Sequence, residues 1–407
     1  MRQLYVACTV LLLLLNALPG AARAQETLRD IRDDLGVSVD GGAISVSGVS
    51  SGGYMAGQYH LAHSTKLIGA GIIAGGPYAC ARTTSFWCDF APGWPGFWMP
   101  HDSCQAIHMC TAAARLEYGL MGAYFGPPDH RDALDTAVDE ALAGRIDPLS
   151  GLKGDRVWLF SGLEDSLMRQ EITDDLRDFY LELYSQDEVD NPPSLLAYED
   201  GWTVEHGMVV DIPGEADRCL EYGPPFINDC GFDAAGQLLA FIHDLKGPAG
   251  GPPGKPAYGA WDGGSLRAFD QRPFFDAGDD SVSLNTQGHI YVPDACRDGV
   301  PCPLHIAFHG CRQHEAAVRQ ACENGGNCPL LFFHEDGGYN EWAEAYGIVV
   351  LYPQATAWGD ASALDKNPRG CWDWWGYSGD GYFRKSAKQI QAVDAMIACL
   401  RGTAPCG

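Results

Sequence analysis

The sequence predicts an α/β protein with a mostly parallel sheet that carries helices on both faces. Short apolar runs, each about as long as a buried strand, alternate along the chain with longer stretches typical of helices. The apolar runs lack the polar alternation of a half-exposed strand, which favours parallel pairing. The alternation resumes after a segment rich in glycine and proline, Lys246–Lys255, which we expect to be a loop or linker.

The individual elements follow from the position of these runs. The expected strands are Ile44–Ser47, Leu67–Ala74, Val157–Phe160, Leu195–Tyr198, His289–Val292, Leu304–Phe308 and Ile348–Leu351. The expected helices are Gly53–Ser64, Asp132–Ala143, Ile172–Tyr184, Ala234–Leu245, Asn340–Tyr346 and Lys385–Leu400.

Residues 1–24 predict a secretory leader. Arg2 precedes the apolar run Val6–Leu15, and residues 22–24 (Ala-Arg-Ala) fit a cleavage site. The run is too short for a membrane-spanning helix. We therefore expect a protein that is exported, to the periplasm or outside the cell, and begins near Gln25.

The cysteine content agrees with export. All of the 15 cysteines except Cys8 follow the leader, and an even number in an exported chain favours disulfides. Six pairs are close in sequence, and a seventh would be long-range: Cys80/Cys88, Cys104/Cys110, Cys219/Cys230, Cys296/Cys302, Cys322/Cys328, Cys399/Cys406 and Cys311/Cys371. Spacing does not prove connectivity. Zinc ligation is the alternative, although no Cys-x-x-Cys pair occurs.

The formal charge of −26 disfavours nucleic acid and anionic lipid surfaces as partners. A neutral substrate is one inference from this charge, and simple solubility is the other. The length allows one elaborated domain or two. We expect a single catalytic domain over residues 25–407, with a Trp- and Cys-rich insertion at about residues 80–130.

The segment Gly48-Val49-Ser50-Ser51-Gly52 fits the G-x-S-x-G nucleophile elbow. In this motif a strand enters a sharp turn that exposes a serine ahead of a helix. Glycine is needed where the turn is strained and neighbouring elements pack closely. The elbow comes early, because in an ordinary α/β hydrolase several strands precede it.

A second motif accounts for the early elbow. The apolar run Leu304–Phe308 leads into His309-Gly310-Cys311, which is typical of the oxyanion loop that normally precedes the elbow of an α/β hydrolase. The strand at Ile348–Leu351 also resembles one that usually comes earlier. The order predicts a circular permutation of one sheet, with the former junction between termini near residues 246–258.

The catalytic acid and base follow in the chain order serine, acid, histidine. Asp165 comes just after the strand Val157–Phe160, although the adjacent Glu164 stays an alternative. His206 follows the next strand. Most of the 12 histidines are expected to be surface or packing residues. His243 lies in an expected helix, and His309 has a structural role in the oxyanion loop. Five others precede the acid and break the chain order: His60, His63, His101, His108 and His130.

Acyl transfer also needs donors for the oxyanion, each typically contributing a factor of about 10² to 10³. We expect one donor to be the backbone N–H of Ser51, which follows the nucleophile. The other would be the N–H of Cys311, which a disulfide could hold in place. We expect neither a metal nor a cofactor.

Several motifs in a shared order resemble the poly(3-hydroxybutyrate) depolymerases, and the likeness covers most of residues 41–400. The motifs are Gly48–Ala56, Phe160–Asp165, Ile227–Cys230 with Asp233, Phe308–Cys311, Tyr339–Trp342 and Asn367–Trp374. The resemblance implies a circularly permuted α/β-hydrolase fold that hydrolyses polyester. It also implies a triad of Ser50, Asp165 and His206, with the Ser51 and Cys311 amides as the oxyanion hole.

By this resemblance the partner would be a neutral aliphatic polyester or its oligomers, and we expect a monomer. The sequence ends at Gly407 without the separate polymer-binding domain of many secreted members, so amorphous polymer or oligomers are the expected substrates. Exposed aromatics bind aliphatic chains. Core packing is the alternative role for each of the candidate tryptophans, which are Trp372, Trp374, Trp375, Trp94 and Trp98.

Two other functions remain open at this point. A feruloyl or acetyl-xylan esterase would use the same chemistry with a different pocket. A non-catalytic polymer- or glycan-binding protein would retain the fold alone, although every catalytic position is filled here.

Overall fold

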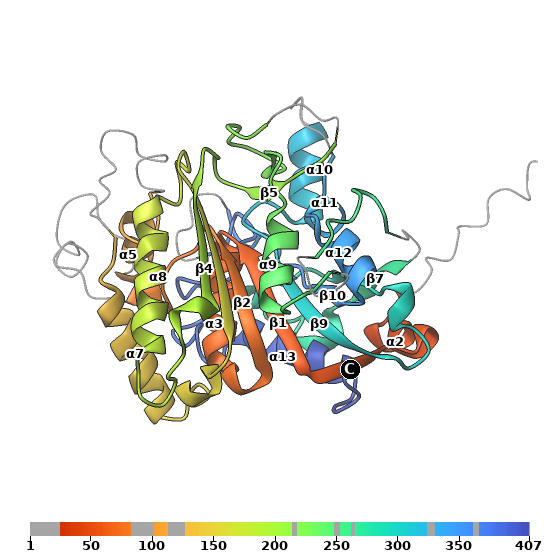
Figure 1. Cartoon of the computed structure of the whole chain (residues 1–407), viewed down its shortest axis with the longest axis horizontal. Coiled ribbons are helices and arrows are strands. Elements are labelled where there is room, and N and C mark those ends of the chain that lie inside the picture. Colours follow the sequence, from red (N-terminus) through yellow and green to blue (C-terminus); the bar gives the residue numbers. More distant parts are fainter. Residues whose placement is uncertain are drawn as a thin grey trace, which may run out of the picture.

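Eight strands form one sheet in the computed structural model (Figure 1). The structure describes residues 25–82, 101–112, 127–213, 218–247, 253–261, 265–323, 330–360 and 366–406. The strands of the sheet, in spatial order, are β4 (Leu196–Trp202), β3 (Arg156–Gly162), β2 (Leu67–Ile73), β1 (Ser38–Val49), β9 (Pro301–Phe308), β10 (Val349–Tyr352), β8 (Gln287–Tyr291) and β7 (Leu266–Asp270).

The six strands from β4 to β10 are parallel, and β8 and β7 continue the sheet in antiparallel pairs. The expected mostly parallel α/β architecture is confirmed. At the centre β1 pairs with β9, with Gly48 beside Phe308. Because both strands run in the same direction, the elbow after β1 and the loop after β9 emerge side by side.

The order of the strands gives the sheet two halves. Strands β1 to β4, from the first part of the chain, make one half, and β7 to β10, from the last part, make the other. In an ordinary hydrolase the half with the oxyanion strand comes first in the chain. Here it comes second, as expected for a circular permutation.

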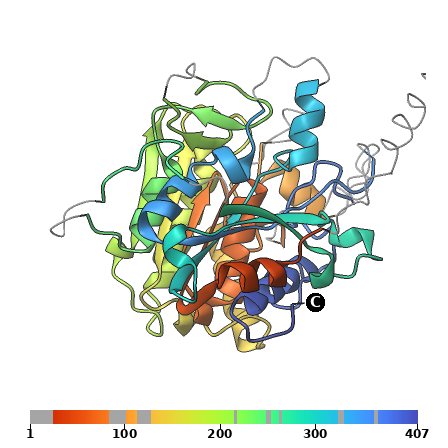
Figure 2. The ribbon, with the colours of Figure 1, turned by 90° about the vertical axis from the view of Figure 1, so that its right-hand side faces the viewer.

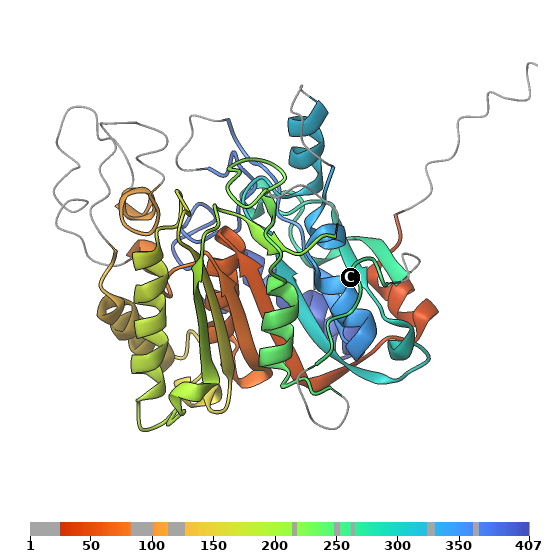
Figure 3. The same ribbon diagram turned by 45° about the horizontal axis from the view of Figure 1, so that its top comes forward.

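Helices cover both faces of the sheet (Figures 1 and 3). One face carries α9 and α12, and the opposite face carries α3 and α13. The helices are α2 (Leu28–Leu35), α3 (Ser51–Ala62), α5 (His101–His108), α7 (His130–Leu142), α8 (Gln170–Tyr184), α9 (Ala234–Ile242), α10 (Glu315–Glu323), α11 (Phe333–Asp336), α12 (Tyr339–Tyr346) and α13 (Lys388–Leu400). No helix in these described ranges is long and apolar enough to cross a membrane.

The first and last described helices lie beside each other (Figure 2). Helix α2 begins with a capping box, in which Thr27 and Asp30 satisfy each other's backbone N–H groups. From this helix the Arg32 guanidinium donates a hydrogen bond of 2.8 Å to the carbonyl of Cys399 in α13. The first and last helices of the described residues are therefore in contact on one surface of the fold.

Some elements differ from the sequence expectations. Strand β1 begins at Ser38, six residues before the expected strand, because the pairing shifts across Asp40-Gly41-Gly42 and then resumes. The edge strand β7 and a small parallel sheet of β5 (Met208–Val210) and β6 (Ile227–Asp229) were not expected. Three- to five-residue strands carry too little periodicity to be recognised in a sequence.

Four of the disulfides expected from the sequence are confirmed: Cys219–Cys230, Cys296–Cys302, Cys399–Cys406 and Cys311–Cys371. The expected pairs Cys80/Cys88 and Cys104/Cys110 are wrong, because Cys80 bonds to Cys110. The short helix α5 packs against residues 80–82, which brings together cysteines 30 positions apart.

Several expectations fall on parts of the chain outside the described residues. These parts are the leader, most of the insertion with Trp94 and Trp98, part of the linker, and Cys88 and Cys328. Cys104 and Cys322 are each disulfide-bonded. Disulfides of this number are typical of proteins that fold in an oxidising compartment.

Candidate active site

The turn after β1 places Ser50 at the mouth of a cavity. Its backbone lies at φ 59° and ψ −121°, a conformation that L-residues rarely adopt. A Cβ on Gly48 would lie 2.2 Å from the carbonyl oxygen of Gly52, and one on Gly52 would lie 2.1 Å from that of Phe308. The glycines are therefore required by the close approach of β1, α3 and β9.

His206 and Asp165 form a buried pair beside this serine. The Nδ1 of His206 lies 2.8 Å from Oδ2 of Asp165, and the two side chains are 5% and 2% exposed. The other carboxylate oxygen accepts the backbone N–H groups of Leu167 and Met168. With Nδ1 donating to the carboxylate, Nε2 is the acceptor, and His206 lines the same cavity as Ser50. The alternative acid, Glu164, is exposed.

The carboxylate of Glu205, which the sequence analysis did not single out, binds the loops that carry His206 and Asp165. Oε1 of Glu205 accepts the backbone N–H of His206 at 2.8 Å. The same oxygen accepts the N–H and the hydroxyl of Ser166, at 2.8 and 2.9 Å. Asn228, from β6, donates to the carbonyl of Glu205. The loops that carry the acid and the histidine are thus tied to each other and to the small sheet.

Ser51 and Cys311 both line the cavity that Ser50 lines. Ser51 is the first residue of α3, where an N–H has no partner within the helix. Neither the Ser51 nor the Cys311 N–H has a hydrogen-bond partner among the residues that the structure describes. The N–H of Gly310, in contrast, donates to Oε1 of Gln313 at 2.6 Å. In the loop after β9, Cys311 is therefore better suited than Gly310 to bind an oxyanion.

The loop after β9 is held by several contacts. Nε2 of Gln313 donates to the carbonyl of Phe226 at 2.8 Å, and Cys311 is bonded to Cys371. The ring of His309 lies between the carbonyl of Gly310 and the N–H of Ala355. Burial lowers the pKa of His309 to about 3, so that the ring stays neutral and fits the structural role expected of it.

The cavity in front of Ser50 has a volume of about 150 Å³. Trp374 and Trp375 line it, and Trp374 stacks on Tyr54 with ring centroids 4.4 Å apart. Trp372 does not line the cavity, because its side chain is fully buried and packs on Phe308. The expectation that Trp372 contacts substrate is corrected accordingly.

One buried acid shapes the loop that carries these tryptophans. The carboxylate of Asp373 accepts the backbone N–H groups of Trp375, Gly376 and Tyr377 through one oxygen. Its other oxygen accepts both the N–H and the hydroxyl of Ser378. Burial raises the pKa of Asp373, and these hydrogen bonds act against the shift. Asp373 thus fixes the turn from which the Trp375 ring enters the cavity wall.

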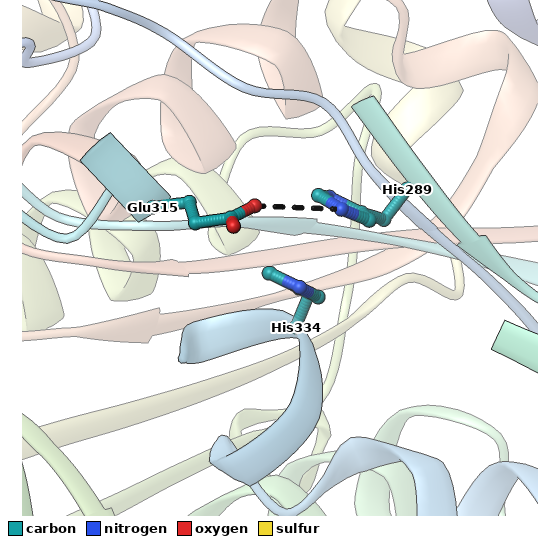
Figure 4. A group of neighbouring side chains, drawn as sticks. All are labelled: His289, Glu315 and His334. Atoms are coloured by element: carbon teal, nitrogen blue, oxygen red, sulfur yellow. Dashed lines mark ion pairs between the residues drawn. The ribbon is translucent and has the colours of Figure 1, made fainter. Parts of the chain in front are cut away.

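One group of residues among those described brings together side chains that can ligate metals (Figure 4). Ligand atoms of His289, Glu315 and His334 lie within 4.8 Å of one another. The imidazole rings are stacked, with centroids 3.7 Å apart and planes 7° from parallel. Their in-plane lone pairs therefore run side by side and do not converge, and Arg319 binds the carboxylate. The arrangement suits a stacked pair of neutral rings better than an ion.

Comparison with known proteins gives relatives of one kind. A poly(3-hydroxybutyrate) depolymerase of Delftia acidovorans is 31% identical over 367 residues, which are 89% of this chain and 60% of that protein. A polyhydroxybutyrate depolymerase of Talaromyces funiculosus is 27% identical over 372 residues, 88% of this chain and 90% of that protein. The chain is a homologue of poly(3-hydroxybutyrate) depolymerases. No family model matches it.

Solved structures of PHB depolymerases share the fold. One, a serine-to-alanine variant complexed with an R3HB trimer, superposes with a TM-score of 0.68 at 23% identity. Another, from Penicillium funiculosum, gives 0.66 at 24% identity. Each likeness covers 91% of this chain and 98% of the other. The expected permuted hydrolase fold is confirmed, and the chain spans about 60% of the length of the Delftia relative.

Proposed function

We propose that this homologue is an exported serine esterase that hydrolyses ester bonds of poly(3-hydroxybutyrate) or related short-chain polyhydroxyalkanoates and their oligomers. The observation that carries the proposal is the convergence on one cavity of Ser50, His206 and the loops bearing the Ser51 and Cys311 amides. These are the nucleophile, base and oxyanion donors of acyl transfer.

The reaction would proceed in two steps. His206 takes the proton of Ser50 as its oxygen attacks the ester carbonyl, while Asp165 orients and stabilises the imidazolium. The oxyanion rests on the Ser51 and Cys311 amides. The alcohol fragment leaves with the proton from His206, and water then hydrolyses the acyl-enzyme by the same route.

Polyester as the substrate is supported by the names of the relatives and by the character of the cavity. The solved depolymerase that binds an R3HB trimer shares this fold. The side chains of Ile107, Leu167, Met168, Trp374 and Trp375 give the cavity apolar walls. An aliphatic ester chain needs such contact more than hydrogen bonds. The reported relatives include no carbohydrate esterase.

The substrate is tested by a parallel assay of the purified protein on amorphous polyhydroxybutyrate, feruloylated xylan and acetylated xylan. We expect soluble hydroxybutyrate from the polyester and no release from either xylan. Hydrolysis of a xylan ester without hydrolysis of the polyester would show that the proposed substrate is wrong, although the proposed mechanism could still hold.

A further inference from the structure

The cavity wall carries charges of one sign, opposite to that of the protein. The chain has 53 acidic residues against 27 lysines and arginines, yet no Asp or Glu is among the described residues that line the cavity. The charged residues that do line it are Arg312, Lys366 and Arg369. A cavity for a wholly neutral substrate has no need of this local reversal of charge.

Two of these cations lack a carboxylate within the described part of the chain. Most described lysines and arginines are ion-paired, for example Arg384 with Glu140 and Lys388 with Asp279. Lys366 and Arg312 form no such pair with any described residue. Lys366 instead lies over the ring of Trp358, 5.5 Å from its centroid. Lys366 itself lines the cavity, and contact with a ring face leaves the N–H groups of its ammonium available to an anion.

The frame that carries the cations is rigid. The N–H of Arg312 donates to the carbonyl of Arg369 at 2.8 Å, and the disulfide between Cys311 and Cys371 joins the same two loops. Arg312 also lies near Tyr222: burial raises the pKa of that phenol, and the guanidinium opposes the rise. The backbone that carries the cations is therefore already ordered before a ligand binds, and only their side chains lose freedom on binding.

We propose that Arg312 and Lys366 bind the terminal carboxylate of an acid-ended hydroxyalkanoate chain. The inference rests on the proposed ester hydrolysis. Such a chain is neutral along its length and carries one negative charge, at its acid end. That end belongs to the alcohol fragment of the ester bond that is cleaved. The acyl C–O bond breaks, water supplies OH to the acyl part and H to the alcohol, and a short hydroxy acid leaves the site.

The test compares a 3-hydroxybutyrate trimer with a free acid end and the same trimer as its methyl ester. At low ionic strength we expect kcat/KM for the acid to exceed that for the methyl ester by about tenfold. Salt should reduce this preference, because it screens the cations. Free 3-hydroxybutyrate should inhibit competitively, and methyl 3-hydroxybutyrate should inhibit less.

The variants Lys366→Gln and Arg312→Gln should each lower the ratio of acid to methyl-ester kcat/KM by about threefold to tenfold. A disturbance of the adjacent Cys311 amide would lower kcat/KM for both trimers alike, so it would leave their ratio unchanged. Lys153→Gln is the matched control, because Lys153 is exposed and lies before β3, at the end of the sheet away from Ser50. Its ratio should equal that of the wild type.

Equal kcat/KM for the two trimers, with a ratio that no variant changes, would overturn the carboxylate site and leave ester hydrolysis intact. Failure to hydrolyse either trimer or the polymer would overturn the proposed function itself, and the inference with it.

Discussion

At Ser50 a strained backbone and two neighbouring glycines fix the turn that places this residue at the cavity, which the buried His206 also lines. A residue in such a conformation typically costs about 1 to 3 kcal/mol, so the surrounding contacts must enforce it. The N–H of Ser50 donates to the carbonyl of Ile73, and its carbonyl accepts the N–H of Tyr54. Both neighbouring elements, β2 and α3, therefore hold the turn.

A substitution of Gln313 tests whether the position of the Cys311 amide matters. The Gln313 side chain holds the loop after β9 but has no proposed part in the reaction itself. We expect Gln313→Ala to lower kcat by about tenfold with little change in KM, since the Cys311 amide loses its fixed position. Steady-state kinetics on a soluble hydroxybutyrate ester measure both constants.

Asn191→Ala is the control for this experiment. Asn191 is also buried, and its amide accepts the N–H of Gly154 and donates to the carbonyl of Leu152 before β3, at the end of the sheet away from Ser50. It should lose stability and keep its kcat. Equal loss of kcat in both variants would mean that Gln313 acts through general stability alone.

Buried histidines predict a pH dependence of stability. Burial lowers the pKa of His289 from 6.5 to about 4. As the pH falls through 6.5 the unfolded chain binds a proton at this residue, while the folded chain does not until about pH 4. Stability from this group is therefore lost as pH falls through that window.

His289→Phe keeps a ring on His334 and removes the titration. Between pH 8 and pH 5 we expect its free energy of unfolding to fall by about 2 kcal/mol less than that of the wild type, measured by urea unfolding. At pH 8 the histidine is neutral in both the folded and the unfolded chain, so a difference in unfolding free energy between the two proteins at this pH reports the change in packing alone. Parallel pH curves for the two proteins would show that this ring does not titrate as described.

The sequence could single out the residues of the proposed triad, and it missed those that position them. Ser50, Asp165 and His206 stand at strand ends in a fixed chain order, so local motifs reveal them. Glu205, Gln313 and Asp373 are ordinary polar residues in a sequence; their roles arise from contacts with backbone groups that only folding brings near. The burial of the Trp372 side chain in the core could not be predicted either. Trp372 lies in a loop, and a loop has no periodic pattern that would show which of its side chains are buried.

At the scale of elements, the loop after β9 depends on the loop that ends at Cys371. The disulfide between Cys311 and Cys371 spans 60 positions. Asn367 adds to it by accepting the N–H and donating to the carbonyl of Cys371. The proposed oxyanion donor, the Cys311 amide, therefore lies on a pair of loops that are joined covalently.

The double variant Cys311→Ser/Cys371→Ser should lose about 4 kcal/mol of stability, because a loop of this length is released in the unfolded chain. It should also lose about tenfold in kcat, since the Cys311 amide is then less well held. Urea unfolding and steady-state kinetics give the two quantities.

Its control is Cys296→Ser/Cys302→Ser, which opens a disulfide that spans only 6 positions at the opposite end of β9. That variant should lose about 2 kcal/mol and keep its kcat. An unchanged kcat in both variants would mean that the disulfide at Cys311 only stabilises the fold.

For the whole molecule, the two halves of the sheet meet at β1 and β9, and the proposed catalysis would use the loop that follows each of these strands. The halves have exchanged their order in the chain, which the early elbow made predictable. The antiparallel edge was harder to predict, because β7 is a short strand and its pairing depends on β8 alone.

The permutation can be reversed by design, because α2 and α13 are adjacent. A chain that starts at Pro253, joins Gly407 to Gln25 through a short Gly-Ser linker and ends at Gly247 should fold. We expect it to keep hydrolysis and to melt within about 5 °C of the natural order. An inactive or aggregated product would show that folding needs the natural order of the two halves, and that the strand positions in the final sheet are not sufficient.

The central claim, acyl transfer through Ser50, is tested most directly by product release from amorphous polyhydroxybutyrate by the wild type and by Ser50→Ala. The intact mass of each protein is measured after rapid quenching. The wild type should release hydroxybutyrate and carry a hydroxybutyryl adduct at Ser50. Ser50→Ala should fold normally, carry no adduct and release product at least about 10⁴-fold more slowly. Release by Ser50→Ala at the wild-type rate would contradict the account.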